Sequence, residues 1–234
     1  ANVVNIVFNS VLSSFGNLIA TESKDRQYEL FKVYRFAASW IYGFAAVGFA
    51  ILLTPFITLW VGAERTLAFS VIGCILIDFY FKGERIVLSN FKTAAGVFEQ
   101  DKYLALIQGV VNLIISIVLV VRIGLVGVYI GTIVSGLIAN VTKPIIIYHV
   151  ILDRRAGEYF RDSVKYCLIL AGQFALFYGI SKVVMPVVTM QSFLIMFVII
   201  SILFNVIFAV LFWKTGEFQY LVTIVKGKFR KRKE

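Results

Sequence analysis

The third long apolar segment of the chain carries charged side chains at helical spacing. Asp78, Lys82 and Arg85 fall at positions i, i+4 and i+7, which share one face of an α-helix. Glu84 lies nearby. A charge at the centre of a bilayer costs roughly 2.5–3.5 kcal/mol on insertion scales, so these charges need water or partners. We therefore expect a water-filled, net cationic cavity. In the alternative interpretation, the span ends near Phe81 and the two cations lie at the membrane interface.

A further candidate cation lies in the fifth apolar segment. Lys143 sits about two-thirds of the way through that segment and precedes Pro144, which weakens the helix by removing a backbone hydrogen bond. Its ammonium group is expected either to face the same cavity or to extend along the lipid to the inner headgroups.

Polar side chains, almost all of them uncharged, form stripes on three expected helices. In lipid every polar group needs a partner, so a stripe on one helix face should meet other helices or water. The stripes are Asn5, Asn9, Ser13 and Asn17 in the first segment, Gln108, Asn112 and Ser116 in the fourth, and Thr132, Asn140 and Lys143 in the fifth. We expect the first five segments to form a polar pathway and the last two to pack at its periphery, facing lipid.

The fifth segment also has a ridge of small residues. Gly127, Gly131, Ser135 and Ala139 recur at spacing four. Such a ridge predicts the close approach of a neighbouring helix.

Other chemistries lack their usual residues. The chain has one histidine, His149, and its two cysteines, Cys74 and Cys167, lie inside apolar segments, so we expect neither a metal site nor a disulfide. It has no GxxxxGK phosphate loop and no convincing Ser-His-Asp set. We therefore expect no metal, no cofactor, no catalytic residue and no enzymatic activity.

The composition places these residues in a membrane. Of the 234 residues 60% are hydrophobic and only 15% are charged, and mean hydropathy is +0.89. Soluble domains are about 25% charged and cannot bury so much apolar surface. The net charge of +10 does not indicate nucleic acid, because the basic residues lie between long apolar segments.

Seven apolar segments are long enough for membrane helices, which need about 20 residues each. They cover roughly 2–20, 35–60, 66–91, 104–122, 124–151, 164–184 and 192–213. Their length and lack of alternation favour helices over strands. We expect three parts: five helices of one lobe in 1–152, two peripheral helices in 153–213, and a basic cytoplasmic tail in 214–234.

The connections between these segments predict the orientation. Those after the first, third, fifth and seventh segments are rich in Lys and Arg and should be cytoplasmic, which places the N-terminus outside. The chain starts at Ala1 without an export signal. We interpret it as the C-terminal part of a longer protein; the alternative is a seven-span protein that has lost only its Met.

The basic tail has two interpretations. It mixes Phe218, Tyr220, Leu221, Ile224 and Val225 with a run of Lys and Arg. It is expected either to lie on the inner leaflet, drawn to anionic lipid, or to be disordered.

Residues 90–139 resemble the C-terminal lobe of bacterial polysaccharide flippases, which belong to the multidrug, oligosaccharidyl-lipid and polysaccharide exporter superfamily. In that family a polar loop leads into a helix with an N-x-x-x-S face, a tight K/R-x-G-x-x-G turn and a G-T-x-x-S helix. The matching residues are Asn112 and Ser116, then Arg122, Gly124 and Gly127, then Gly131, Thr132 and Ser135, and Gly16, Asn17 and Ala20 match a G-N-x-x-A span end. The likeness covers about the first 150 residues, and the rest agrees in hydropathy only.

The resemblance implies an all-α integral membrane protein with seven transmembrane helices, which form the second lobe of a MATE-like two-lobe transporter plus two extra helices. It implies that an undecaprenyl-diphosphate-linked oligosaccharide crosses the bacterial cytoplasmic membrane by alternating access against the missing N-terminal lobe, in O-antigen or capsule biosynthesis. Membrane lipids are a further partner, and a polysaccharide polymerase is a candidate partner.

Site residues follow from the same resemblance. Lys and Arg donors suit a diphosphate, and amides suit sugars or water. The expected diphosphate ligands are Lys82, Arg85 and Lys143, and the expected sugar or water contacts are Asn5, Asn9, Gln108 and Asn112. Asp78 would tune the site or bind a coupling cation.

Two rival classes stay open. Within transport, the alternative is a lipid II or multidrug exporter of the same superfamily, although an exporter of cationic drugs should have an acidic cavity. Outside transport, the alternative is a membrane-embedded polysaccharide-assembly enzyme or subunit, and an enzyme should have a long outer loop or a His-centred motif.

Overall fold

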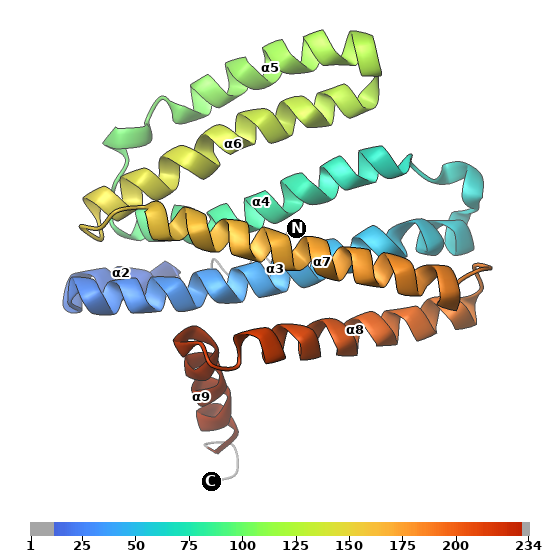
Figure 1. The fold of residues 1–234 in the computed structure, drawn as a ribbon. Coiled ribbons are helices and arrows are strands. Elements are labelled where there is room, and N and C mark those ends of the chain that lie inside the picture. Colours follow the sequence, from blue (N-terminus) through green and yellow to red (C-terminus); the bar gives the residue numbers. More distant parts are fainter. Residues whose placement is uncertain (1–11, 231–234) are drawn as a thin grey trace.

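The computed structural model describes residues 12–230, and within that range the chain is helical and has no strand. The helices are α2 (Leu12–Thr21), α3 (Lys24–Val61), α4 (Phe69–Ala94), α5 (Leu104–Ile123), α6 (Leu125–Val150), α7 (Gly157–Val184), α8 (Met190–Phe212) and α9 (Gly216–Arg230) (Figure 1). Two short 3-10 turns, η1 (Ala63–Arg65) and η2 (Glu99–Asp101), precede α4 and α5. The prediction of an all-helical chain is confirmed for this range.

Five helical segments of the described range are long and apolar enough to cross a membrane. They are α3, the stretch Glu99–Ile123 that contains α5, α6, α7 and α8. The expected first span, 2–20, is described only from residue 12, and α4 is long enough but has four charged residues between 78 and 85. Multiple apolar helices suit a multi-pass membrane protein, and the total of seven stays a prediction.

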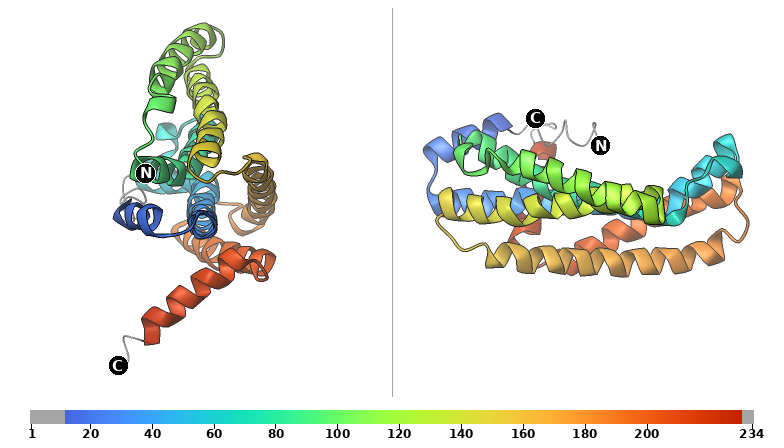
Figure 2. Two further views of the ribbon diagram at one scale, coloured as in Figure 1. Left: turned by 90° about the vertical axis from the view of Figure 1, so that its left-hand side faces the viewer. Right: turned by 90° about the horizontal axis from the view of Figure 1, so that it is seen from above.

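α3 is the central helix of the bundle. The end view in Figure 2 shows it surrounded by the other helices, and it contacts α4, α7, α8 and α9. α4 lies between α3 and α6, and α2 packs against α4. The α5–α6 hairpin forms an outer layer that is joined to the rest through α4 (Figure 1).

α3 begins earlier than its apolar segment predicts. The expected connection between residues 20 and 35 is helical from Lys24 onward, so α3 extends beyond its apolar segment instead of starting after a loop. Ser23 caps this helix, because its hydroxyl accepts a hydrogen bond from the Arg26 amide at 3.3 Å. Gln27 Nε2 donates to the Ile19 and Glu22 carbonyls, which closes the turn between α2 and α3.

The predicted small-residue ridge on α6 is confirmed. Gly127, Gly131, Ser135 and Ala139 are all buried. A Cβ atom on Gly127 would lie 2.5 Å from the backbone carbonyl carbon of Leu119, so glycine is what permits α5 to approach.

α8 packs one face against α3. Phe204, Phe208 and Phe212 are fully buried, and Trp40 of α3 stacks on Phe208 with ring centroids 4.9 Å apart. Trp40 Nε1 also donates to Asn205 Oδ1 at 2.8 Å. α8 therefore buries one face against α3 and leaves the other, with Ile202, exposed.

The α5–α6 contact gives a stability prediction. Gly127→Ala should lower the free energy of unfolding by about 1–3 kcal/mol, because the new methyl group meets backbone that cannot rotate away. The midpoint of thermal unfolding in detergent measures this effect. Gly109→Ala is the matched control: nothing lies near its Cβ position on α5, so alanine should be neutral or slightly stabilising. Equal midpoints for the two variants would contradict the close packing.

Candidate functional site

The charged residues of α4 point in different directions. Glu84 faces the interior between α3 and α7, Arg85 reaches α6, and Lys82 is exposed with Asp78 beside it. The sequence spacing predicts that Asp78, Lys82 and Arg85 share one face of the helix. In the structure Asp78 and Lys82 pair with each other, whereas Arg85 bonds to α6.

The Asp78–Lys82 pair lies midway along α4. Lys82 Nζ is 2.6 Å from Asp78 Oδ2, and the Lys82 side chain is 59% exposed. α4 packs between α3 and α6, and both of these helices are apolar enough to span a membrane. An exposed ammonium group at this place would be costly against lipid chains, although the Asp78 carboxylate beside it is only 13% exposed. This face of α4 therefore requires water or another polar surface.

Two more of the expected cations lie in the seam between α4 and α6. Arg85 Nη1 donates to the carbonyl oxygen of Gly136 at 2.7 Å, and Gly136 lies midway along α6. Lys143 Nζ donates to Ser89 Oγ at 2.9 Å. Both cations are partly buried, and both of these acceptors are neutral. Their charges are therefore held by hydrogen bonds that an anion can outcompete.

The expected polar contacts of α5 are used between helices. Gln108 Nε2 donates to the Ser135 carbonyl at 3.0 Å, and Asn112 Nδ2 donates to Thr132 Oγ1 and Ser135 Oγ at 3.2 and 3.3 Å. Ser116 Oγ donates to Asn112 Oδ1 at 3.2 Å. Gln108 and Asn112 thus bind α6 rather than line an open space. The other two expected sugar contacts, Asn5 and Asn9, lie outside the described residues.

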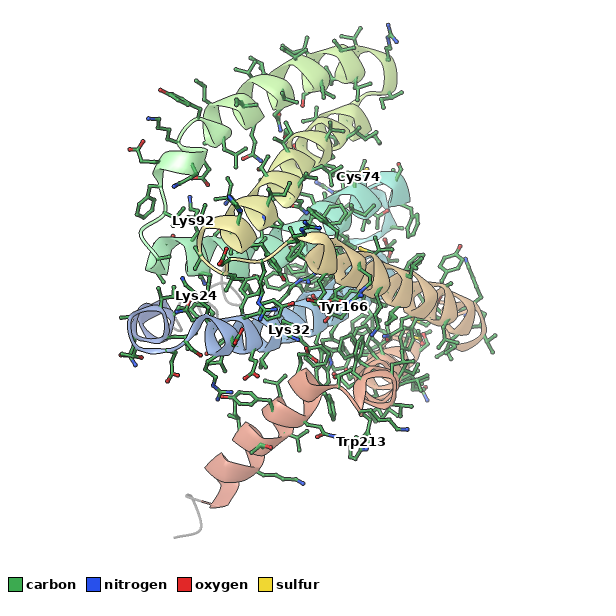
Figure 3. All side chains as sticks on the ribbon, turned by 60° about the vertical axis from the view of Figure 1, so that its left-hand side comes forward. Lys24, Lys32, Cys74, Lys92, Tyr166 and Trp213 are labelled. Atoms are coloured by element: carbon green, nitrogen blue, oxygen red, sulfur yellow. The ribbon has the colours of Figure 1, made fainter. Side chains whose placement is uncertain are left out.

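A buried ion network that the sequence analysis missed joins α3, α4 and α7. Arg35 is the first residue of the expected second span, and it is only 2% exposed. Its Nη2 donates to the Tyr159 carbonyl and to Ser163 Oγ, both at 2.7 Å, and its Nη1 lies 3.7 Å from Asp162 Oδ2. Its guanidinium stacks 3.6 Å from the Tyr159 ring centroid, and Tyr166, which points from α7 into the bundle, flanks it at 5.6 Å (Figure 3).

Glu84 supplies the second carboxylate of this network. It is 3% exposed, and its Oε1 lies 3.9 Å from Arg35 Nη2. Ser163 Oγ and the Tyr80 hydroxyl donate to its two oxygens at 3.3 and 3.4 Å. The available sequence signal was the carboxylate itself, because an acid within an apolar segment requires a cationic partner.

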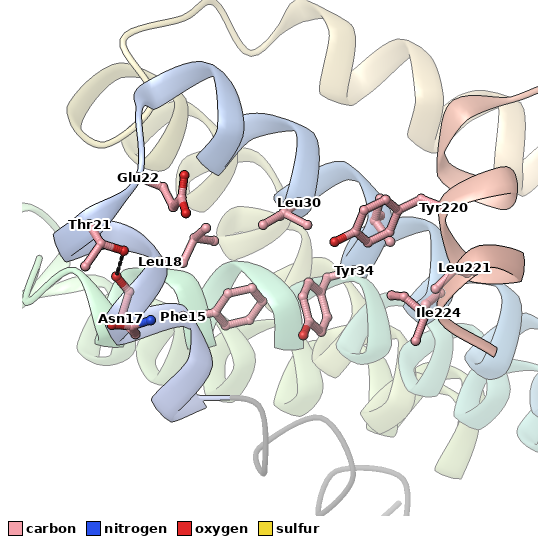
Figure 4. Close-up of a pocket in the computed structure, with 12 residues that line it drawn as sticks. Phe15, Asn17, Leu18, Thr21, Glu22, Leu30, Tyr34, Tyr220, Leu221 and Ile224 are labelled. Atoms are coloured by element: carbon pink, nitrogen blue, oxygen red, sulfur yellow. Dashed lines mark hydrogen bonds between the residues drawn. The ribbon is translucent and has the colours of Figure 1, made fainter. Parts of the chain in front are cut away.

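Of the grooves on the described part of the bundle surface, two lie next to the buried network and next to α9, and neither is the expected cationic cavity. One, of about 470 Å³, lies between α4, α6 and α7 and is lined by Glu84, Asn140 and apolar side chains. The other, of about 310 Å³, lies between α2, α3 and α9 (Figure 4). Lys82, Arg85 and Lys143 line neither groove. Among the described residues, Lys82 therefore lies on an exposed face of α4, and Arg85 and Lys143 lie between α4 and α6.

Comparisons of the chain with protein-family models, with curated proteins and with solved structures found no match. The likeness to polysaccharide flippases therefore stays a prediction from the sequence motifs.

The buried network predicts strong coupling between two residues. Arg35→Met should lower the free energy of unfolding by roughly 3–5 kcal/mol, because it leaves the Glu84 carboxylate buried without its cation. The double variant Arg35→Met with Glu84→Met should recover most of that loss, since no buried charge of the pair remains. Thermal or denaturant unfolding in detergent measures the free energy of unfolding of both variants.

Arg26→Met is the control for the same substitution at an exposed position. Its partner Glu29 is 2.9 Å away and both side chains are exposed, so the loss should stay below about 1 kcal/mol. If Arg35→Met were as mild as this control, or the double variant no better than the single, Arg35 and Glu84 would not be coupled.

Proposed function

We propose that this chain is a transport lobe of a multi-pass membrane protein whose substrate is an undecaprenyl-diphosphate-linked oligosaccharide. The proposal includes the seven-helix arrangement and the MATE-like partner lobe. It places the chain in the bacterial cytoplasmic membrane with its C-terminus in the cytoplasm.

One observation carries the proposal: the Asp78–Lys82 pair midway along α4, whose lysine is 59% exposed while its aspartate is 13% exposed. Apolar helices flank α4 on both sides, so the pair is expected at membrane depth. Neither a purely structural subunit nor a lipid-facing helix needs an exposed lysine there. A polar pathway through the membrane needs such a group, and a second lobe facing α4 would enclose that pathway.

The charge on this side of the bundle favours an anionic substrate. Lys82, Arg85 and Lys143 outnumber Asp78, and the protein acceptors described above for Arg85 and Lys143 are neutral. Phosphate oxygens form charge-assisted hydrogen bonds about twice as strong as neutral ones. A diphosphate that enters beside α4 can therefore displace these contacts, while its prenyl chain stays in lipid.

The basic residues support the orientation. Lys24, Lys92 and Arg154 lie near the helix ends at one end of the bundle, where α3 begins, α4 ends and α6 ends (Figure 1). Clustered Lys and Arg mark the cytoplasmic side of a membrane protein. The same end is reached by α9, and this agrees with a cytoplasmic C-terminus.

Transport gives the third prediction. In proteoliposomes, dithionite quenching of a fluorescently labelled undecaprenyl-diphosphate oligosaccharide reports its translocation. Lys82→Ala in the protein that contains this chain should slow translocation at least about tenfold, because a hydrogen bond to a charged group contributes roughly 1.5–3 kcal/mol and 1.4 kcal/mol is a factor of ten.

Lys102→Ala is the matched control. Lys102 is also an exposed lysine paired with a carboxylate, Glu99 at 3.0 Å, but it lies in the α4–α5 connection. It should translocate at the wild-type rate. Unchanged translocation in Lys82→Ala, or no translocation by the wild type, would contradict the proposal. Faster movement of lipid II than of the oligosaccharide lipid would favour the lipid II exporter instead.

A further inference from the structure

The cations beside α4 continue from its middle to its last turn. Arg85, Ser89 and Lys92 recur at spacings of four and three residues, so they lie on one side of the helix. Lys143 of α6 joins this row by donating to Ser89. At a rise of about 1.5 Å per residue the row extends roughly 10 Å along the helix axis. Lys82 lies one turn before it, so the row leads from the last turn of α4 to the exposed lysine.

Lys92, at the inner end of the row, is occupied by a carboxylate. It lies in the last turn of α4, at the end of the bundle where α3 begins (Figures 1 and 3). Its Nζ is 2.7 Å from both Oδ1 and Oδ2 of Asp101 in η2, and the two side chains are only 13% and 8% exposed. Lys92 thus differs from Arg85 and Lys143, whose acceptors described above are neutral.

Asp101 is the counter-charge for more than one cation. Among the described residues, the charged groups that act on Lys143 are Lys92, Asp101 and Arg85. One carboxylate therefore faces three cations at the inner end of the seam between α4 and α6. A diphosphate has more negative charge and more acceptor oxygens than a carboxylate. It can therefore compete with Asp101 for Lys92 and Lys143 together.

The segment that contains Asp101 can leave α4 without uncovering a core. Gly96, between α4 and η2, has a φ of +68°, and nothing lies within 4 Å of its Cβ position. Phe98 is 54% exposed and the Glu99 side chain is 83% exposed. Lys92 holds this segment through the ion pair and through the Phe98 ring, whose centroid is 5.4 Å from its Nζ. Displacement of Asp101 by another anion would therefore release η2.

We propose that Asp101 keeps the inner-leaflet entrance of the polar pathway closed by occupying Lys92, and that the diphosphate of the substrate displaces it. The inference rests on the proposed function, because it uses the same substrate and the same orientation. In that orientation the last turn of α4 lies at the inner headgroups. A lipid diphosphate of the inner leaflet then meets Lys92 and Lys143 first, and Arg85 and Lys82 afterwards.

Binding of undecaprenyl diphosphate to the purified protein that contains this chain tests the proposal in detergent. Asp101→Asn should lower the Kd at least about threefold, because the closed site no longer competes with the open one. Lys92→Gln should raise the Kd about tenfold, because it removes a charged hydrogen-bond donor. In the Lys92→Gln background Asp101→Asn should give a clearly smaller gain, since the carboxylate no longer blocks that lysine.

Glu99→Gln is the matched control. It removes a carboxylate from the same turn, but one that is exposed and paired with Lys102 at 3.0 Å, so the Kd should stay at the wild-type value. If Asp101→Asn bound no more tightly than this control, the entrance would be refuted, while binding and translocation by the wild type would leave the proposed function standing. Absence of binding in both the wild type and Asp101→Asn would refute both.

A second measurement leaves the ion pair intact. Cys74 and Cys167 are replaced by Ala, and Glu99→Cys carries an environment-sensitive fluorophore on η2. Undecaprenyl diphosphate should shift the emission as η2 moves away from α4. Undecaprenol, which has the same chain without phosphates, should not. Unchanged emission at saturating undecaprenyl diphosphate would overturn the displacement of Asp101, whether or not the Asp101→Asn variant folds.

Discussion

The cost of a charge in a low-dielectric environment determines the surroundings of α4. This helix has four charged residues within two turns, and its neighbours α3 and α6 are apolar. Glu84 is neutralised inward, because Arg35 reaches it from α3 and Ser163 donates to it from α7. Asp78 and Lys82 are paired with each other and remain on the outer face. α4 thus has two kinds of neutralised carboxylate: Glu84, which pairs with a buried arginine, and Asp78, which pairs with an exposed lysine.

The other polar groups of the bundle are mostly satisfied between helices. The amides of Gln108 and Asn112 bind α6, and Arg85 and Lys143 bridge α4 and α6. The Asp78–Lys82 pair differs from these contacts because its lysine is exposed in the middle of the bundle. A polar pathway beside α4 would surround this pair with water, which lipid cannot do. It would also bring a diphosphate close to Arg85 and Lys143, whose hydrogen-bond acceptors described above are neutral.

The parts of the fold that depend on local patterns could be predicted from the sequence. Long apolar segments gave the helices, and the spacing of Gly127 and Gly131 predicted the close approach of α5. The burial of Arg35 could not be predicted in this way, because it depends on Glu84 and Asp162, which are distant in the sequence. The polar face of α5 was predicted, but the periodicity of one helix cannot show that Asn112 meets Thr132 rather than water. The early start of α3 was not predicted because its first turns are held by the Ser23 cap and by the packing of Tyr28 and Phe31 on Tyr148, which is distant in the sequence.

Cysteine accessibility separates a water-lined face of α4 from a lipid-facing one. Cys74 and Cys167 are free thiols and would first be replaced by Ala. In that background, a membrane-impermeant charged maleimide should label Lys82→Cys in intact membranes, while Ile114→Cys, exposed on the apolar outer surface of α5, should stay unlabelled. A Lys82→Cys variant as unreactive as Ile114→Cys would show that lipid covers this face, and the polar pathway beside α4 would then be excluded.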